Sequence, residues 1–146
     1  MENNPKEVAV ELKTAIDDNG EMEYNTVRAT GQLFQKSRMD VLSYEETAED
    51  GSPIKNMITI YSDRVAVKRT GLVNMHQHFR ERKTSENVFQ HPHGNIHMET
   101  FTNTITYQAL SDNQKGMLII DYVVKLNGQD ERNHQLTLTI RHKEGL

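Results

Sequence analysis

The sequence predicts an all-β protein, an antiparallel up-and-down β-barrel that is closed or nearly closed. Residues 58–79 alternate β-type and polar residues, with interruptions that divide them into three short strands and two tight turns. The pairs Asn19-Gly20 and Asn127-Gly128 supply the positive φ angles that tight hairpins need. The chain as a whole yields about nine strands, within a range of about 8–10, and no helix, so closure of the sheet is expected.

Length and composition limit the function classes. A chain of 146 residues indicates one domain, which we expect over residues 7–146, behind a disordered tail at residues 1–6. The absence of cysteine excludes disulfides and thiol chemistry and fits a reducing compartment. There is no apolar run of membrane length, no signal-peptide pattern and a net charge of only −4. We therefore expect a cytoplasmic protein whose partners are neither nucleic acid nor a membrane.

The N-terminal strands follow from the period of the apolar residues. Residues 8–16 alternate with a period of two and also fit one face of a helix; the Asn-Gly turn that follows favours a strand. Residues 21–35 read as one long strand, in which Gly31 marks a bulge or bend. The other expected strands are residues 41–46, 54–61, 65–69, 72–79, 96–107, 117–126 and 136–140.

The C-terminal half contains one irregular region and one strongly apolar strand. Residues 80–87 are charged and are expected to form an exposed loop, followed by a turn at residues 89–94. Within residues 96–107 the apolar positions change parity, with Phe101 grouped with the later residues, which requires a bulge or break near residues 99–101. Residues 117–126 have one fully apolar face and should form the most buried strand.

Four short motifs suggest a family. They are Tyr44-x-Glu46, Arg69-x-Gly71, Phe89-x-x-Pro92-x-Gly94 and Tyr122 within the apolar strand. In order and spacing, from about Val8 to Ile140, the chain resembles the YwiB-like family of small bacterial proteins of unknown function, found mainly in Gram-positive species. The resemblance implies a calycin-like, lipocalin-type β-barrel and brings no established activity, ligand or catalytic residue. The chain has no tryptophan and so lacks the Gly-x-Trp signature of true lipocalins.

The histidines are the residues in this chain best suited to binding a transition metal. His76 and His78 are two apart and point to the same side of a strand, where they could bind zinc, copper or nickel. However, Val73, Met75 and Phe79 mark the opposite face as buried, so we predict that the two histidines face solvent and hold no metal. The full set is His76, His78, His91, His93, His97, His134 and His142.

No catalytic constellation is recognisable in the sequence. The serines lie mostly in or beside turns, and no Gly-x-Ser-x-Gly elbow occurs. Glu45 and Glu46 are adjacent on a strand and point to opposite faces, so they cannot act together on one substrate. The sequence therefore predicts neither a cofactor nor a catalytic residue.

Tyr44, Glu46 and Arg69 are the candidate site residues. If Leu42 faces the interior, Tyr44 and Glu46 share its face, and if Val67 faces the interior, so does Arg69. A charge inside a barrel is costly unless it is paired. We therefore predict an Arg69–Glu46 pair beside the Tyr44 hydroxyl, which acts either as a structural plug or as the polar anchor for a ligand.

Three functions remain open at this point. The first is a non-enzymatic barrel that binds a small, partly apolar or amphipathic ligand in its lumen, as barrels of about eight strands can. The second is a protein-interaction module with a filled interior, and the third is an enzyme. An open apolar cavity would favour the first, whereas a filled lumen would favour the second.

Overall fold

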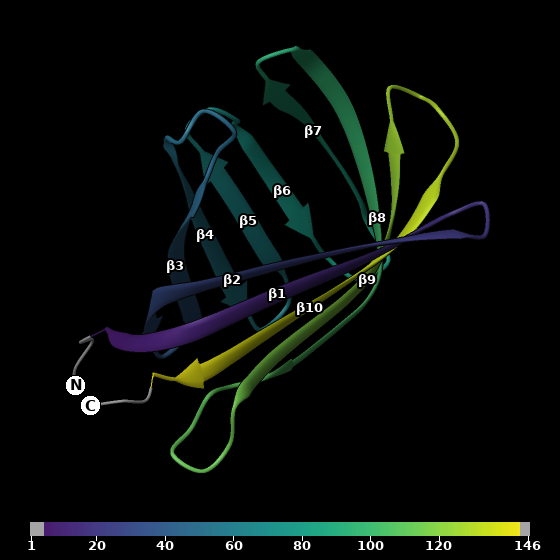
Figure 1. Ribbon diagram of the computed structural model, residues 1–146. Coiled ribbons are helices and arrows are strands. Elements are labelled where there is room, and N and C mark those ends of the chain that lie inside the picture. The colour runs from purple at the N-terminus through teal and green to yellow at the C-terminus, as the bar shows by residue number, and fades with distance from the viewer. Residues whose placement is uncertain (1–4, 144–146) are drawn as a thin grey trace.

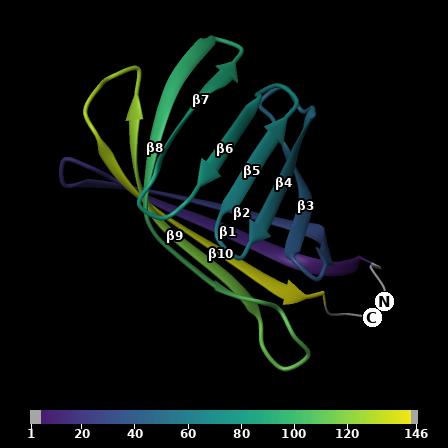
Figure 2. The same ribbon diagram turned by 180° about the vertical axis from the view of Figure 1, so that it is seen from behind.

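The computed structural model describes residues 5–143 and consists of ten antiparallel strands. Their bounds are β1 Lys6–Asp18, β2 Glu21–Gln35, β3 Met39–Thr47, β4 Pro53–Tyr61, β5 Val65–Thr70, β6 Met75–Phe79, β7 Thr84–His91, β8 Gly94–Gln108, β9 Gly116–Leu126 and β10 Arg132–His142. The strands form one sheet in the order β6-β5-β4-β3-β2-β1-β10-β9-β8-β7, which curls into a nearly closed barrel (Figures 1 and 2). The predicted fold class is confirmed.

The barrel closes incompletely where its two edge strands meet. Asn74 and Gln90, beside β6 and in β7, exchange two backbone hydrogen bonds of 2.9 and 2.8 Å. Apart from this bridge, β6 and β7 form no ladder of backbone pairs within residues 5–143. On the inner side, the Gln77 Nε2 atom of β6 donates to Thr100 Oγ1 of β8 at 2.8 Å. We call this junction of β6 with β7 and β8 the seam.

Both Asn-Gly pairs lie where the sequence placed them. Asn19 and Gly20 have φ angles of 54° and 90°, and Asn127 and Gly128 have φ angles of 49° and 72°. These positive values suit the turns that follow the right-handed twist of a hairpin. The first pair joins β1 to β2 and the second begins the connection from β9 to β10, so the two predicted hairpins are confirmed.

Residues 80–87 were expected to form a loop, and this expectation is wrong for the second half of that range. Strand β7 starts at Thr84 and pairs with β8 from Thr84↔Phe101 to His91↔Gly94. Its residues alternate between exposed and half-buried, without one fully buried position, so the sequence carries only a weak strand signal. The expected turn at residues 89–94 is correspondingly shorter, and Phe89 belongs to the strand.

The expected irregularity in β8 exists but lies further along. The register against β9 shifts between Thr102 and Thr104, which leaves Asn103 as the extra residue of a bulge. Thr100 and Thr102 are fully buried, whereas Phe101 between them is half-buried on the opposite face. The parity grouping of Phe101 with the later residues is therefore wrong, because the change of face occurs after it.

Gly31 does not form the expected bulge, because the ladder between β1 and β2 passes through it without a shift. Its lack of a side chain serves close packing instead. A Cβ atom at this position would lie 2.6 Å from the carbonyl oxygen of Ser43 and 3.0 Å from the Cβ atom of Tyr44. Gly31 is also where the pairing of β2 with β3 ends, so the two strands separate beyond it.

The interior differs between the two ends of the barrel. One end is filled by fully buried side chains, which include Phe79, Leu33, Leu42, Leu118, Ile120, Leu138, Ile140, Val8 and Val65. Strand β9, with a buried residue at every second position from Gly116 to Val124, contributes most regularly to this core, as predicted. The other end carries the β3–β4 and β7–β8 turns (Figures 1 and 2), and its interior is not filled.

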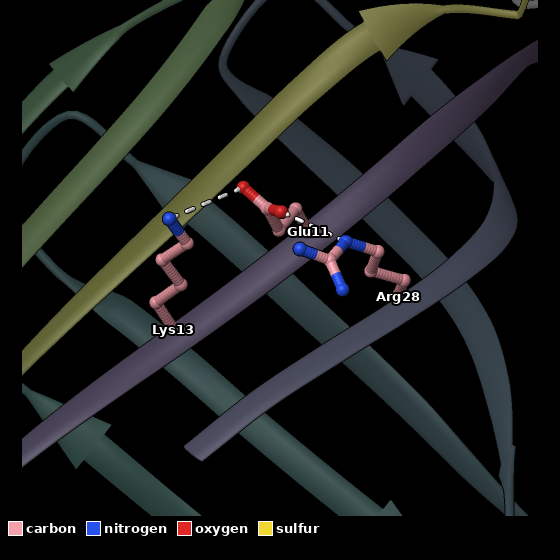
Figure 3. Close-up of polar contacts among 3 residues, drawn as sticks. All are labelled: Glu11, Lys13 and Arg28. Carbon is pink, nitrogen blue, oxygen red and sulfur yellow. Dashed lines mark hydrogen bonds and ion pairs between the residues drawn. The ribbon is translucent and has the colours of Figure 1, made fainter. Parts of the chain in front are cut away.

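The outer face of the β1–β2 hairpin carries a cluster of charged side chains around Glu11. Arg28 Nε on β2 lies 3.0 Å from the Glu11 carboxylate on β1, and Lys13 Nζ lies 3.9 Å from the other oxygen of the same carboxylate (Figure 3). Because Lys13 and Arg28 are exposed and Glu11 is partly exposed, such pairs contribute at most about 1 kcal/mol each.

Of the expected N-terminal tail, residues 1–4 lie outside the described residues, and Lys6 already belongs to β1. Among residues 5–143 no helix is long and apolar enough to cross a membrane.

Candidate functional site

A cavity of about 570 Å³ occupies the unfilled end of the barrel. Most of its lining is apolar and comes from nearly every strand, with Leu12, Ile58, Val124 and Leu136 as examples. Pockets that bind small molecules fall in the range of about 300–1,000 Å³ and combine an apolar wall with a few convergent polar groups. The remaining question is therefore which polar groups the barrel directs into this space.

One row of the sheet places the predicted site residues together. Tyr44 of β3 pairs with Asn56 of β4, Asn56 pairs with Arg69 of β5, and Arg69 pairs with Met75 of β6. Directly paired residues in antiparallel strands point to the same face. All four side chains line the cavity, so the row forms one wall of the site.

Glu46 and Arg69 form an ion pair at the mouth of this wall. Glu46 lies two residues beyond Tyr44 on β3, and the Arg69 side chain reaches across β4 to contact its carboxylate. The side chains are 28% and 19% exposed for Arg69 and Glu46, so the pair is neither fully buried nor freely solvated. This partial burial places it at a rim, where the Arg69 stem can pack on apolar neighbours while its charge stays near water.

Tyr44 stands behind the pair and is only 4% exposed. Burial first, and then the negative charge of Glu46, raises the pKa of its hydroxyl to about 12, with Arg69 acting in the opposite direction. The hydroxyl is thus protonated at neutral pH and can both donate and accept a hydrogen bond. Gly31 of β2 pairs with Tyr44 of β3, and because glycine has no side chain it leaves space for the Cβ atom of Tyr44.

The opposite wall presents two aromatic rings in contact, tilted relative to each other. Tyr122 of β9 pairs with His134 of β10, and their ring centroids are 5.0 Å apart at an interplanar angle of 34°. Tyr122 is 6% exposed, and burial raises the pKa of its hydroxyl well above the ordinary value. Burial, and secondarily the charge of Arg132, lowers the pKa of His134 to about 4. The imidazole is therefore neutral near pH 7 and offers one donor and one acceptor.

Comparison with known proteins decides the family. Residues 10–138 match a family described as a domain of unknown function, DUF1934. The chain belongs to this family.

Two comparisons with one relative agree with that assignment. The chain is 28% identical over 132 residues to the uncharacterized beta-barrel protein YwiB of Bacillus subtilis (strain 168), a match that covers 90% of this chain and 91% of that protein. The crystal structure of ywiB protein from Bacillus subtilis is similar with a TM-score of 0.82 and 25% identity, covering 96% of this chain and 94% of that chain. The resemblance read from the sequence motifs is confirmed. The DUF1934 family is one of unknown function, and kinship with calycins and lipocalins stays a prediction.

Within this family member, the structure unites the three predicted site residues. Tyr44, Glu46 and Arg69 line one cavity, and the predicted contact between Arg69 and Glu46 is present. His76 and His78 are exposed on the outer face of β6, as expected. In residues 5–143 no group of three or more histidine, aspartate or glutamate side chains is arranged to hold a metal ion.

Sequence reasoning missed several polar residues of the cavity, three of which lie on otherwise apolar strand faces. Asn56, Gln77 and His134 all line it, and none was proposed for the site. Each occupies a position on an otherwise apolar strand face: Asn56 lies between Ile54 and Ile58 in that alternation. The sequence did contain a signal for these residues: each is polar at a strand position where the alternation predicts an inward, apolar side chain. A polar group is kept in a core only where it finds a partner or a ligand.

Proposed function

We propose that this protein is a non-enzymatic, cytoplasmic binding barrel that holds one small, partly apolar ligand in its lumen. The observation that carries the proposal is the open, mostly apolar cavity of about 570 Å³ at one end of the barrel. A lumen of this kind matches the known use of barrels of about eight strands as containers for a single small ligand. Tyr44, Glu46 and Arg69 act as the polar anchor at its mouth.

The polar side chains that line the cavity support the proposal. Tyr44 and Tyr122 are each more than nine-tenths buried, and both line the cavity. The Asn56 Nδ2 atom donates to the Ile54 carbonyl at a long 3.3 Å. Polar groups at such a wall can exchange hydrogen bonds with a ligand in the cavity.

The half-filled interior separates this proposal from the interaction module considered above. A module that works only through its outer surface needs no lumen, and filling the lumen would add stability at roughly 0.8 kcal/mol per buried CH₂. The apolar wall of the cavity instead remains without packing partners. A bound apolar molecule would supply these packing partners, which explains why the lumen is not filled by side chains.

The direct test is native mass spectrometry of the protein purified from its own host, which should reveal a retained small molecule. A second test uses N-phenylnaphthylamine, an uncharged dye that fluoresces in apolar pockets. The Val27→Phe variant adds a ring to the cavity wall and should abolish dye binding, because Val27 is half-buried and lines the cavity. Thr30→Phe adds the same ring to the exposed outer face of β2 and is the matched control. Equal dye binding by both variants would contradict a lumenal site.

A further inference from the structure

The charges on the cavity wall balance. The lining residues comprise one acidic side chain, Glu46, and one basic side chain, Arg69, and these two contact each other. His134 is the one histidine among the lining residues, and its depressed pKa keeps it neutral near pH 7. The lining therefore carries no net charge, and its two opposite charges already satisfy one another.

The other polar groups of the wall are all neutral and two-sided. The hydroxyls of Tyr44 and Tyr122, the amide of Asn56 and the neutral imidazole of His134 can each donate and accept hydrogen bonds. They project from both walls of the cavity, from β3 and β4 on one side and from β9 and β10 on the other. Such a set suits an alcohol, an amide or the edge of an uncharged heterocycle.

A charged ligand head would disrupt the ion pair. An anionic head could reach Arg69 only by competing with Glu46, which would then be left half-buried beside a second negative charge. A cationic head would compete with Arg69 for Glu46 and leave the guanidinium without its partner. Leaving a group unpaired or placing like charges together is the usual means by which a site rejects the wrong ligand.

From these observations we infer that the Arg69–Glu46 ion pair is a specificity determinant, and that the lumen selects an uncharged amphipathic molecule with a hydrogen-bonding head over the corresponding acid or amine. This inference rests on the proposed lumenal binding function and adds the chemical class of its ligand. It assigns Glu46 the role of neutralising Arg69, and Arg69 the role of neutralising Glu46.

The test uses three probes that share one apolar body and differ in the head: decanol, decanoate and decylammonium. Their affinities are measured near pH 7.5 and at constant salt by displacement of N-phenylnaphthylamine, below the solubility limit of decanol and below the micelle concentrations of the two ions. We expect decanol to bind at least about tenfold more tightly than either ion, because each ion leaves one member of the pair unpaired. Decanoate or decylammonium binding as tightly as decanol would overturn the inference.

Variants of the pair should change the preference in opposite directions. Glu46→Gln frees Arg69 and should raise decanoate affinity relative to decanol by about tenfold or more, whereas Arg69→Gln frees Glu46 and should favour decylammonium in the same way. Glu11→Gln removes an equal charge from the outer-face pair of Figure 3 and should leave the ratios unchanged. An unchanged decanoate-to-decanol ratio in Glu46→Gln would contradict the assigned role.

Two further outcomes keep the tests of function and specificity apart. If the single variants fail to fold by circular dichroism, the double variant Glu46→Gln/Arg69→Gln restores charge balance and should again prefer decanol over both ions. Loss of that preference in the folded double variant would overturn the inference. If the wild-type protein binds neither the dye nor any of the three probes, the proposed lumenal function itself fails, and the inference about the head group fails with it.

Discussion

Separating Arg69 from Glu46 should reveal an energetic coupling of intermediate size. Two unit charges about 4 Å apart at an effective dielectric constant of about 20 attract by about 4 kcal/mol. Desolvation of both groups offsets part of this attraction, and the exposed fractions of 28% and 19% indicate partial rather than complete burial. A fully exposed pair contributes at most about 1 kcal/mol, whereas breaking a buried one costs about 3–5 kcal/mol. We therefore expect a coupling of about 1–3 kcal/mol.

The assay is a double-mutant cycle of Arg69→Met, Glu46→Gln and the double variant, each unfolded in urea. The chain contains no tryptophan and five tyrosines, so circular dichroism and tyrosine fluorescence are the suitable signals. Each single variant should lower the free energy of unfolding, and the double variant should be milder than the sum by about 1–3 kcal/mol. The m-values should stay constant, because the surface exposed on unfolding hardly changes.

A matched cycle on Arg28 and Glu11 serves as the control. This outer-face pair has side chains that are 73% and 31% exposed for Arg28 and Glu11, so its coupling should stay below about 1 kcal/mol and weaken with added salt. Effects of Arg69 and Glu46 that add within about 0.5 kcal/mol would refute the pairing. Couplings of equal size in the two cycles would refute the claim that the cavity wall shelters the pair.

Three other changes have defined outcomes. Gly31→Ala should lower the free energy of unfolding by about 1–3 kcal/mol in urea melts, because its Cβ atom would lie 2.6 Å from the Ser43 carbonyl oxygen. Asn87→Leu should raise it by about 1–3 kcal/mol in the same melts, since both amide atoms of Asn87 are buried without a partner in the described residues. Burial chiefly lowers the pKa of His134 to about 4 from 6.5, so the unfolded chain binds a proton that the folded protein does not. Stability should then fall as the pH drops from 6.5 toward 4, by less than about 1.4 kcal/mol per pH unit because the ring is partly exposed. Melts of His134→Asn between these pH values should show a shallower loss.

Each of these expectations has a result that would contradict it. A Gly31→Ala variant as stable as wild type would mean that β2 and β3 can move apart without cost. A destabilised Asn87→Leu variant would show that its amide finds a partner near the seam. An unchanged pH slope in His134→Asn, matched by an exposed control such as His93→Asn, would remove the histidine from the acid sensitivity of the fold.

The sequence by itself determined most of the strands and their faces. Side-chain alternation is a local property of an extended chain, so the inward positions of Leu42, Tyr44, Val67 and Arg69 could be read without knowing any partner strand. The Asn-Gly turns were equally predictable, because Asn and Gly adopt positive φ angles at little cost, whatever their distant contacts are. The first half of strand β7 was predicted as a loop for the same reason. Its residues alternate only between exposed and half-buried positions, so the local pattern that indicates a strand was weak.

Only the tertiary structure decided register, closure and the contents of the lumen. The bulge at Asn103 lies where β8 must match β9, and no local feature fixes that position. The alignment of Tyr44, Asn56 and Arg69 in one row depends on two pairings between separate strands. Whether the interior fills depends on the summed volume of side chains from all ten strands and on the point, at Gly31, where β2 and β3 stop pairing. Register, closure and filling each depend on residues that are far apart in the sequence. The cavity and its polar wall could therefore not be predicted from any single segment.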